Sequence, residues 1–378
     1  MKEATLGVVV GFDREIFLHQ IHGGVSRGFA SIISELSKDK SLGIEPRLLF
    51  SKSSNYYINA LNPELEPSRS FLKSNSGWST LATYGITREI SSMWAGGKNS
   101  NSSIDILHAT YYRPLLLDRL AAKKLALTIH DFIPERLGWT GFRNPHIGKR
   151  SLCKKADLIV CVSQTTKTET LERYALDESQ VRVIYQGVNL PTDISARTEI
   201  GSDPYLLFVG HRTGYKNFNE FLRAFSLVRV RFADMKLVLV GPELSAVEGE
   251  CLNELAGEGN WCALPPQTDE ELQSLYRSAF AHVVASSMEG FGMTILESMA
   301  QGTPVIINDI PIFHEVAGNA GNYFSHNSPE SFLAAIEYLS LSSNYRRMSQ
   351  LSIQRSLDFS WHRAAVLHAE AYKEVLLN

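Results

Sequence analysis

The sequence predicts an α/β protein made of two doubly wound domains. Its 378 residues exceed what one hydrophobic core usually serves. Short continuous apolar runs, typical of parallel strands buried on both faces, alternate with helical patterns in both halves of the chain. Both periodicities disappear over residues 191–204, which are rich in Pro, Thr, Asp, Ser and Gly. We therefore expect a first domain over residues 1–190, a linker over 191–204 and a second domain from residue 205.

Composition and charge exclude several classes of function. Hydrophobic residues make up 44% of the chain and charged residues 20%, as in an ordinary globular protein. The formal net charge of −3 argues against general nucleic-acid binding, which normally needs a strongly basic domain. The first residues lead directly into a predicted strand without a signal peptide, and no run approaches the ~20 apolar residues of a membrane span. We expect a cytoplasmic protein with no nucleic-acid partner.

The first half of the chain opens with a strand, a glycine loop and a helix. Residues 6–10 form the apolar run, the loop reaches Gly23 and Gly24, and the next helix has an apolar stripe that should face inward. A glycine loop lets the backbone approach a ligand closely. Two glycines alone are a weak signal, however, and fit a flexible turn equally well.

Further strands are predicted over residues 104–108, 125–129, 156–162 and 181–185, and Ser163 is expected to cap a helix that ends at Tyr174. The strand at 125–129 ends immediately before His130 and Asp131. Ligands of open parallel sheets bind just beyond the carboxyl ends of the strands. There, His130 could bind a ligand hydroxyl or stabilise charge that develops in a reaction, although a single histidine is more often structural.

The second half repeats the pattern with two cations on its first loop. A strand over residues 205–210 leads through Arg212 and Lys216 into a helix with an aromatic inward stripe. Arg212 can donate hydrogen bonds to two oxygen atoms at once, and Lys216 adds a point charge. Together they could neutralise a diphosphate. Surface arginines and lysines are usually only solvated, so this interpretation depends on what lies opposite the loop.

Residues 282–309 combine a strand, a glycine loop, a helix and the next strand in one short stretch. The loop holds Glu289 and Gly292, and the helix is expected over residues 293–301. The start of a helix presents unpaired N–H groups and its positive dipole end, so this loop is a predicted anion site.

Two carboxylates belong to the same stretch. Glu289 lies in the loop, and Glu297 lies on the border between the apolar and polar sides of the helix. Ionised carboxylates only accept hydrogen bonds, which suits the hydroxyls of a sugar or a ribose better than a phosphate. Either glutamate alone is more often solvated or stabilised by the helix dipole, but the joint pattern is rare.

The string SxxEGFGMTILESMAQGTPVI, followed by residues 314–321, resembles the signature of the retaining nucleotide-sugar glycosyltransferases of family 4. The resemblance implies the GT-B fold, in which two Rossmann-like domains face across a cleft. It also implies that the final helix, residues 359–378, crosses back to the first domain and leaves residues 205–358 to the second. The first domain is then the acceptor-binding domain and the second binds the nucleotide sugar.

The resemblance also implies roles for individual residues. Glu289 would hold hydroxyls of the donor sugar, Glu297 the ribose, and Arg212 and Lys216 the diphosphate. His130 would lie beside the donor sugar. The loop that meets the sugar and the diphosphate would contain Phe291, Gly292, Met293 and Thr294. Gly23 and Gly24 would lie opposite the diphosphate and near the acceptor.

The predicted reaction transfers a hexose to a saccharide or lipid-linked saccharide acceptor in the synthesis of a cell-surface polysaccharide. The string HDFxPE at residues 130–135 resembles the polysaccharide mannosyltransferase branch and favours GDP-mannose as donor, with UDP and dTDP sugars open. No side chain is placed as a nucleophile, which favours front-face transfer. There is no DxD motif, and the four cysteines show no zinc or disulfide pattern, so we expect metal independence and no cofactor besides the donor.

The sequence leaves open two alternative functions and the role of one basic segment. A sugar-nucleotide epimerase would keep the fold but need no acceptor, and a two-lobed sugar-binding protein would leave the donor intact. A basic segment could make a peripheral contact with anionic lipid or a lipid-diphosphate acceptor, although a solvated helix face is the commoner explanation. Its members are Arg143, His146, Lys149, Arg150, Lys154 and Lys155.

Overall fold

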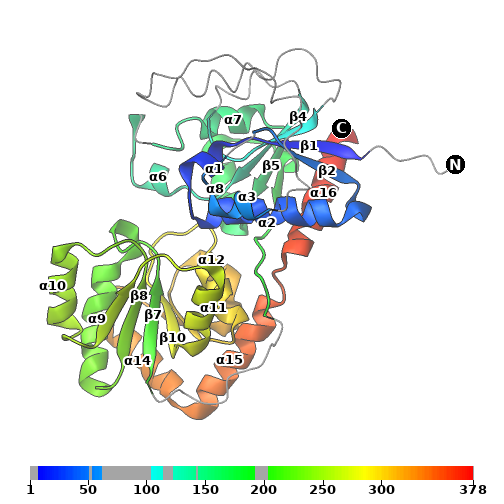
Figure 1. The fold of residues 1–378 in the computed structure, drawn as a ribbon. Coiled ribbons are helices and arrows are strands. Elements are labelled where there is room, and N and C mark those ends of the chain that lie inside the picture. Colours follow the sequence, from blue (N-terminus) through cyan, green and yellow to red (C-terminus); the bar gives the residue numbers. More distant parts are fainter. Residues whose placement is uncertain are drawn as a thin grey trace, which may run out of the picture. The chain divides into compact units, whose positions relative to one another are not determined.

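Two α/β units, each built around its own parallel sheet, make up the chain (Figure 1). The computed structural model describes residues 7–50, 53–61, 104–113, 122–141, 144–191 and 203–377. Unit 1 comprises residues 1–185 together with 361–378, and unit 2 comprises residues 186–360. Each has a parallel sheet flanked by helices, so the predicted fold class is confirmed. Most of the predicted linker, residues 192–202, lies outside the described residues.

The sheet of unit 1 has six parallel strands within the described residues, in the order β2-β1-β3-β4-β5-β6. The strands are β1 (Val8–Phe12), β2 (Ile44–Leu48), β3 (Ile104–Ala109), β4 (Ala122–Ile129), β5 (Leu158–Cys161) and β6 (Val181–Val183). The helices are α1 (Glu15–His19), α2 (Gly24–Lys38), α3 (Tyr56–Ala60), α6 (Ile133–Arg136), α7 (Lys149–Lys155) and α8 (Gln164–Tyr174), with 3₁₀ turns η1 (Lys40–Leu42) and η4 (Glu178–Gln180). Every residue of β5 is buried, as a central parallel strand requires.

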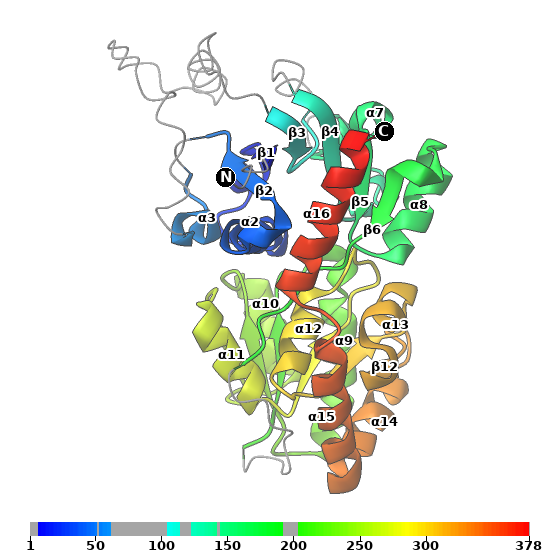
Figure 2. The same cartoon turned by 90° about the vertical axis from the view of Figure 1, so that its right-hand side faces the viewer.

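The last helix, α16 (Trp361–Leu377), belongs to unit 1, as the resemblance implied. It packs on α2, β4 and β5 (Figure 2). The Tyr372 hydroxyl lies 2.5 Å from His108 Nδ1, and His108 Nε2 lies 2.8 Å from Thr128 Oγ1. All three side chains are buried, so these hydrogen bonds hold α16 on the sheet from inside the core.

The sheet of unit 2 has six parallel strands among the described residues, in the order β12-β11-β10-β7-β8-β9. The strands are β7 (Tyr205–Val209), β8 (Lys236–Val240), β9 (Trp261–Leu264), β10 (Ala281–Val284), β11 (Val305–Asn308) and β12 (Gly321–Phe324). The helices are α9 (Phe218–Arg231), α10 (Ala246–Leu255), α11 (Asp269–Ser278), α12 (Met293–Ala300), α13 (Pro311–Ala317), α14 (Pro329–Ser340) and α15 (Ser342–Ser356), with 3₁₀ turns η5 (Gly214–Lys216) and η6 (Gly318–Ala320). The aromatic stripe of α9 is buried in the core of this unit, as predicted.

The order of strands in unit 2 reverses between β7 and β10. Strands β7, β8 and β9 run outward in one direction, and β10, β11 and β12 run outward in the other. The loops that leave the carboxyl ends of β7 and β10 therefore turn away to opposite sides, and sheets of this kind bind ligands at such a switch point. The predicted site residues of the second domain follow these two strands.

In the described ranges, no helix is long and apolar enough to cross a membrane.

Candidate functional site

Two loops of unit 2 are tied together at the switch point. The Asn217 side-chain amide donates to the Ala285 carbonyl at 3.0 Å, and the Ser287 N–H donates to the Tyr215 carbonyl at 2.8 Å. These bonds join the loop after β7 to the loop after β10. They bring together residues from two strand–loop–helix segments. The sequence predicted each segment separately but did not show that their loops are in contact.

Lys216 and Glu289 meet at this junction. Lys216 Nζ lies 2.5 Å from Glu289 Oε1, and the two side chains keep 21% and 16% of their surface exposed. A partly buried ion pair of this geometry holds both groups in fixed positions while leaving them accessible to a ligand. The carboxylate and the cation predicted to bind adjacent parts of a nucleotide sugar are therefore neighbours.

Helix α12 begins directly after this loop. Gly292 is its N-cap with a φ of 103°, and no side chain caps the helix. A Cβ at Gly292 would lie 3.1 Å from Ile295 Cδ1, so both the backbone angle and the packing require glycine. Met293 and Thr294 form the half-buried first turn. Phe291 is buried and packs edge-to-face on Phe359 at 6.0 Å, so its side chain anchors the loop.

Glu297 lies one turn further along α12. Its Oε2 accepts a hydrogen bond from the Tyr276 hydroxyl at 3.1 Å. Tyr276 is almost fully buried on α11, and its carbonyl accepts a bond from Thr303 Oγ1 at 2.6 Å. Tyr276 therefore fixes the orientation of Glu297, a contact between helices that no sequence pattern indicated.

Arg212 is engaged within unit 2. Its Nε donates to Glu248 Oε1 at 2.9 Å, and its Nη2 donates to the carbonyls of Pro242 and Glu243 at 2.6 and 3.1 Å. Although partial burial acts in the opposite direction, hydrogen bonds from Ser245 and Arg212 lower the pKa of Glu248. The side chain of Arg212 thus joins the loops after β7 and β8, while its Nη1 makes no hydrogen bond with the described residues.

In unit 1 the predicted glycine loop leads into α2. Gly23 is the N-cap, and Gly24 is the first helical residue. Gln20 Oε1 accepts a hydrogen bond from the Ser26 N–H at 3.0 Å, and a Cβ at Gly23 would lie 2.3 Å from that same oxygen. Glycine at position 23 therefore makes room for a side chain that caps the helix.

His130 lies at the carboxyl end of β4 and is 8% exposed. Its backbone N–H donates to the Tyr112 hydroxyl at 3.0 Å. Its ring packs edge-to-face on Phe29 at 5.7 Å, and its Nε2 makes no hydrogen bond with the described residues. Burial, reinforced by His146 and Lys149, lowers the pKa of His130 to about 3. The imidazole is therefore neutral near pH 7.

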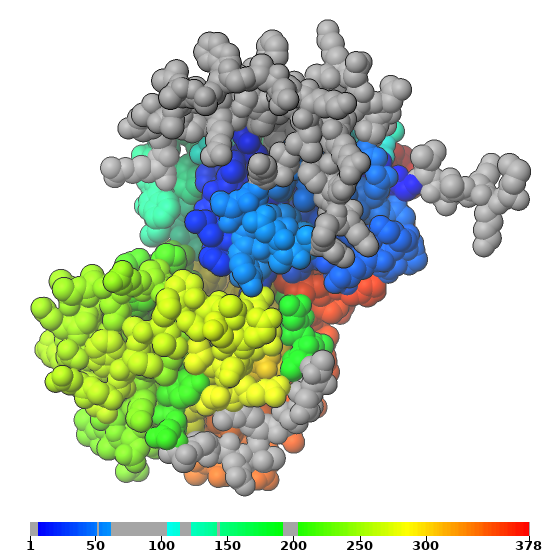
Figure 3. All heavy atoms as spheres, viewed as in Figure 1, coloured from blue at the N-terminus to red at the C-terminus, as the bar shows by residue number. Residues whose placement is uncertain are grey.

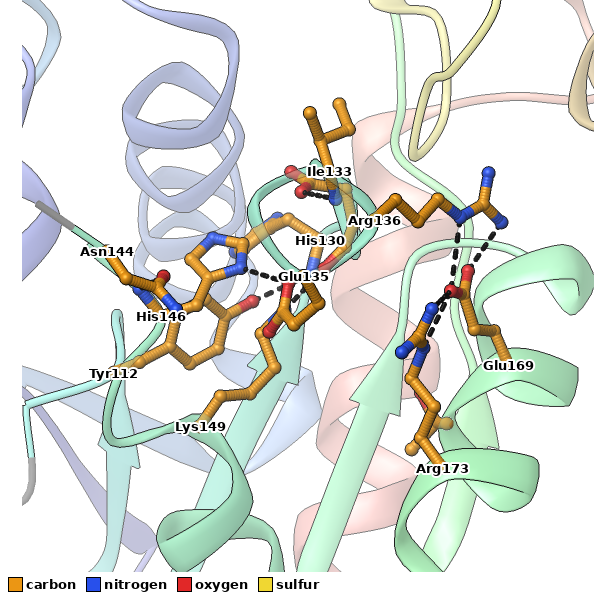
Figure 4. Close-up of polar contacts among 12 residues, drawn as sticks. Tyr112, His130, Ile133, Glu135, Arg136, Asn144, His146, Lys149, Glu169 and Arg173 are labelled. Atoms are coloured by element: carbon orange, nitrogen blue, oxygen red, sulfur yellow. Dashed lines mark hydrogen bonds and ion pairs between the residues drawn. The ribbon is translucent and has the colours of Figure 1, made fainter. Parts of the chain in front are cut away.

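The loop that follows His130 is held by a buried lysine (Figure 4). Lys149 Nζ donates to the Asp131 carbonyl at 2.5 Å and lies 2.8 Å from Glu135 Oε1. It also lies over the rings of Phe132 and Tyr112, at 4.2 and 4.8 Å from their centroids.

The basic segment around α7 is consequently not one continuous surface. Lys149 is fully buried, and His146 is 6% exposed with its Nδ1 2.9 Å from Glu135 Oε2. Both were predicted as members of an exposed patch, and this part of the prediction is wrong because Glu135 draws both side chains inward. Arg143 lies outside the described residues, while the remaining three are exposed: Arg150, Lys154 and Lys155.

The carboxyl ends of β1 and β3 contribute a buried acid that the sequence analysis missed. Asp13 is 5% exposed and accepts hydrogen bonds from the Thr110 hydroxyl, the Thr110 N–H and the Glu15 N–H. Burial raises the pKa of Asp13 to about 6, although these hydrogen bonds lower it. The sequence signal that could have identified Asp13 is its position directly after an apolar strand.

Among the described residues, no three His, Cys, Asp or Glu side chains are grouped so that they could hold a metal ion.

Comparison with known proteins extends these observations. The O-antigen chain mannosyltransferase RfbU of Salmonella typhimurium is 30% identical over 186 residues, which cover 49% of this chain and 51% of RfbU. The D-inositol 3-phosphate glycosyltransferase of Nocardia farcinica is 28% identical over 276 residues, covering 68% of this chain and 60% of the relative. The chain thus spans about half to three-fifths of the length of these curated relatives.

The fold is shared with solved protein structures. The Anabaena protein HepE in complex with UDP-glucose has a TM-score of 0.68 and 14% identity, covering 97% of this chain and 99% of HepE. The family model described as Glycosyltransferase Family 4 matches residues 22–191, and the one described as Glycosyl transferases group 1 matches residues 192–353. Because these two models match adjoining halves and together reach from residue 22 to residue 353, the chain belongs to glycosyltransferase family 4.

Proposed function

We propose that this protein transfers a hexosyl unit, with retention at its anomeric carbon, from a nucleotide diphosphate sugar to a saccharide or lipid-linked saccharide. The observation that carries the proposal is the Lys216–Glu289 ion pair at the switch point of unit 2. The start of α12 follows Glu289 in the same loop, so a diphosphate and the sugar attached to it can be bound side by side. Membership of the family supports the same chemistry.

The diphosphate is bound by cations and backbone N–H groups. An ammonium group has three donors, so Lys216 can bridge the Glu289 carboxylate and a phosphate oxygen. The first turn of α12, at Met293 and Thr294, adds N–H groups and the positive end of the helix dipole. Arg212 holds its loop through Nε and Nη2, and we assign a phosphate contact to its Nη1.

Two side chains of unit 2 bind the organic part of the donor. Glu289 accepts hydrogen bonds from the sugar hydroxyls, in an orientation set by Lys216. Glu297, oriented by Tyr276, accepts bonds from the ribose hydroxyls. In unit 1, His130 is neutral, so its Nε2 can accept a hydrogen bond from a sugar hydroxyl without placing a positive charge next to the sugar.

We propose that transfer takes place on one face of the sugar. Glu289 is paired with a lysine that would weaken it as a nucleophile, so we assign deprotonation of the acceptor to the departing phosphate. We also propose that Lys216 and the helix start supply the positive charge that a metal ion would otherwise bring. Full turnover in excess EDTA is the expected result, and loss of turnover that Mg²⁺ or Mn²⁺ restores would refute this part.

The donor we favour is GDP-mannose. The HDFxPE string and the similarity to a mannosyltransferase support mannose, whereas the structural likeness to HepE keeps UDP-glucose as the second candidate. A ligand that binds only the native state raises the melting temperature, so a thermal-shift panel of nucleoside diphosphates and their sugars identifies the base. The expected result is a larger shift for GDP than for UDP or dTDP.

The reaction itself is tested with radiolabelled donor and a set of saccharide acceptors. Transfer of label to an acceptor, with retained configuration by NMR, is expected. An altered sugar nucleotide formed from donor alone would instead identify an epimerase, and intact donor with every acceptor would identify a binding protein. The cytoplasmic location and a membrane contact through Arg150, Lys154 and Lys155 stay predictions, testable by cell fractionation and vesicle sedimentation.

A further inference from the structure

Three aromatic rings gather beside the glycine loop of unit 1. His22 precedes Gly23, and Tyr56 and Tyr57 begin α3. The His22 ring lies 5.1 Å from that of Tyr56 and 6.3 Å from that of Tyr57, and the two tyrosine rings are 5.3 Å apart. We call these three residues the aromatic platform.

The platform lies on the surface of the unit. His22 is exposed, Tyr56 is 43% exposed and Tyr57 is half-buried. In the space-filling view the light blue α3 segment lies at the surface beside α2 (Figure 3). Ile21, whose carbonyl accepts a bond from the Tyr56 N–H, is also exposed, at 59%. Adjoining exposed apolar side chains are typical of a binding surface.

A buried asparagine holds the platform in place. Asn55 is fully buried, and its Nδ2 donates to the Gln20 carbonyl at 2.6 Å while its Oδ1 accepts from the Ile58 N–H at 3.0 Å. The Tyr56 N–H donates to the Ile21 carbonyl at 2.9 Å. These bonds join the start of α3 to the loop that carries His22, so the rings are preorganised.

The arrangement of the rings favours a sugar. The His22 and Tyr56 rings are inclined by only 33°, whereas the Tyr57 ring stands nearly perpendicular to both, at 84° and 85°. The faces of aromatic rings carry partial negative charge, which attracts the C–H groups on one face of a pyranose. Hydroxyl and imidazole groups at the ring edges, together with Arg27 at 5.8 Å from the Tyr57 centroid, can bond the sugar hydroxyls.

The platform also lies at the edge of its sheet where the parallel strands end. Helix α2 starts at Gly24 beside His22, and Phe29 on the same helix packs on His130. His22 follows β1 and α1, and His130 follows β4, so both lie on the side where the carboxyl ends of parallel strands meet. A sugar bound here would lie on the same side of unit 1 as His130.

We propose that the aromatic platform is a saccharide subsite that binds one pyranose ring of the acceptor by stacking. The assignment rests on the proposed function, because it supplies the acceptor half of the reaction with named residues. Its aromatic rings distinguish it from the diphosphate site, which is in unit 2.

Saturation-transfer NMR on the full chain tests the subsite directly. The probes are the methyl glycosides of mannose, glucose, galactose and N-acetylglucosamine, with farnesyl phosphate as the lipid-like comparison, in the presence of GDP. Irradiating the aromatic protons of the protein should transfer saturation to the ring C–H protons of at least one glycoside. Replacement Tyr56→Ala or His22→Ala should weaken that binding roughly tenfold.

Matched variants separate the subsite from a structural effect. Tyr56→Phe keeps the ring and should bind within about threefold of the original chain. Tyr338→Ala removes a comparably exposed tyrosine on α14, 37% against 43%, and should change nothing. If Tyr56→Ala does not fold, His22→Ala carries the test, since that side chain is on an exposed loop.

The proposal is overturned if no glycoside receives saturation, if both alanine variants bind as the original chain does, or if only the farnesyl chain responds. GDP, UDP and dTDP melting shifts recorded on the same samples report the donor site independently. Glycoside binding that depends on Tyr56 without any nucleotide shift would uphold the platform and refute the proposed function. A nucleotide shift without glycoside binding would refute the platform and leave the proposed donor site standing.

Discussion

Lys216 and Glu289 form an ion pair across 73 positions of sequence. Each side chain sets the position of the other, so we expect them to act as a unit rather than as independent contributors. This expectation separates a functional pair from two solvated charges that happen to be close.

Replacing Glu289 with alanine should lower transfer on the order of 100-fold while leaving the fold intact, because the sugar loses its carboxylate acceptor. Lys216→Met should cause a similar loss and also weaken nucleoside diphosphate binding. Single-turnover rates and a double-mutant cycle measure both effects, and the double variant should be little worse than either single one. The exposed pair Lys236–Asp203, at 3.3 Å, is the control and should show almost no coupling. Full turnover by Glu289→Ala would refute its role.

Lys149 is a second residue whose environment decides its contribution. Replacing it with methionine leaves the Glu135 carboxylate without a buried cation and should destabilise the protein by about 3–5 kcal/mol. Lys154→Met on the exposed side of α7 should change stability by less than about 0.5 kcal/mol. Urea denaturation midpoints measure the difference. Equal midpoints for the two variants would mean that Lys149 is not the structural cation described above.

At the scale of elements, the start of α12 depends on one glycine. Gly292→Ala would place a Cβ 3.1 Å from Ile295 Cδ1 on a backbone with φ of 103°, and should cost about 1–2 kcal/mol or more. The shift of the helix start should also weaken diphosphate binding, which the melting shift with GDP measures. Gly259→Ala is the matched control, because φ is also positive there, at 79°, but nothing lies within 4 Å. A larger loss at Gly259 would contradict the packing argument.

Local signals identified several elements correctly because their determinants are close in sequence. Ser163 caps α8 by accepting a bond from the Thr166 N–H at 2.9 Å. Strand ends were less accurate, since β1 begins at Val8 rather than at residue 6. The edge strand β2 and helix α15 were not anticipated, because neither has the strong apolar pattern of a central element.

At the scale of the molecule, buried histidines make stability depend on pH. Burial lowers the pKa of His130 to about 3 and those of His282 and His368 to about 4, and it lowers that of His108 well below its usual value. The unfolded chain takes up these protons below about pH 6.5, whereas the folded chain does not. The free energy of unfolding should therefore fall as the pH falls from about 6.5 towards 4.

Asp13 acts with the opposite sign. Its folded pKa of about 6 lies above the usual value of 3.8, so between these values the folded chain binds the extra proton and gains stability as the pH falls. Four histidines outweigh one carboxyl group, and the net effect should be acid destabilisation. Urea unfolding between about pH 7.5 and about pH 4.5 measures it, and His368→Gln should reduce the slope. A free energy of unfolding that stays constant or rises towards acid would contradict this account.

The sequence alone determined the fold class, the glycine loops and the family. These features depend on short-range periodicity, on strand–loop–helix order and on the EGFG string with its second glutamate. Each of these signals lies within a short stretch of the sequence, so it can be read without knowledge of tertiary contacts. It also placed Glu289, Lys216 and His130 at the carboxyl ends of strands, because parallel strands leave their loops at one edge.

Only the tertiary structure decided which of these side chains meet and which are buried. Pairing of β7 with β10 brings Lys216 to Glu289. Arg212 instead bonds Glu248, and Glu297 bonds Tyr276. The basic run before and within α7 was misinterpreted because Glu135 draws Lys149 and His146 into the interior. Contacts of this kind are made by segments distant in sequence, and burial depends on the three-dimensional surroundings of a residue rather than on its neighbours along the chain.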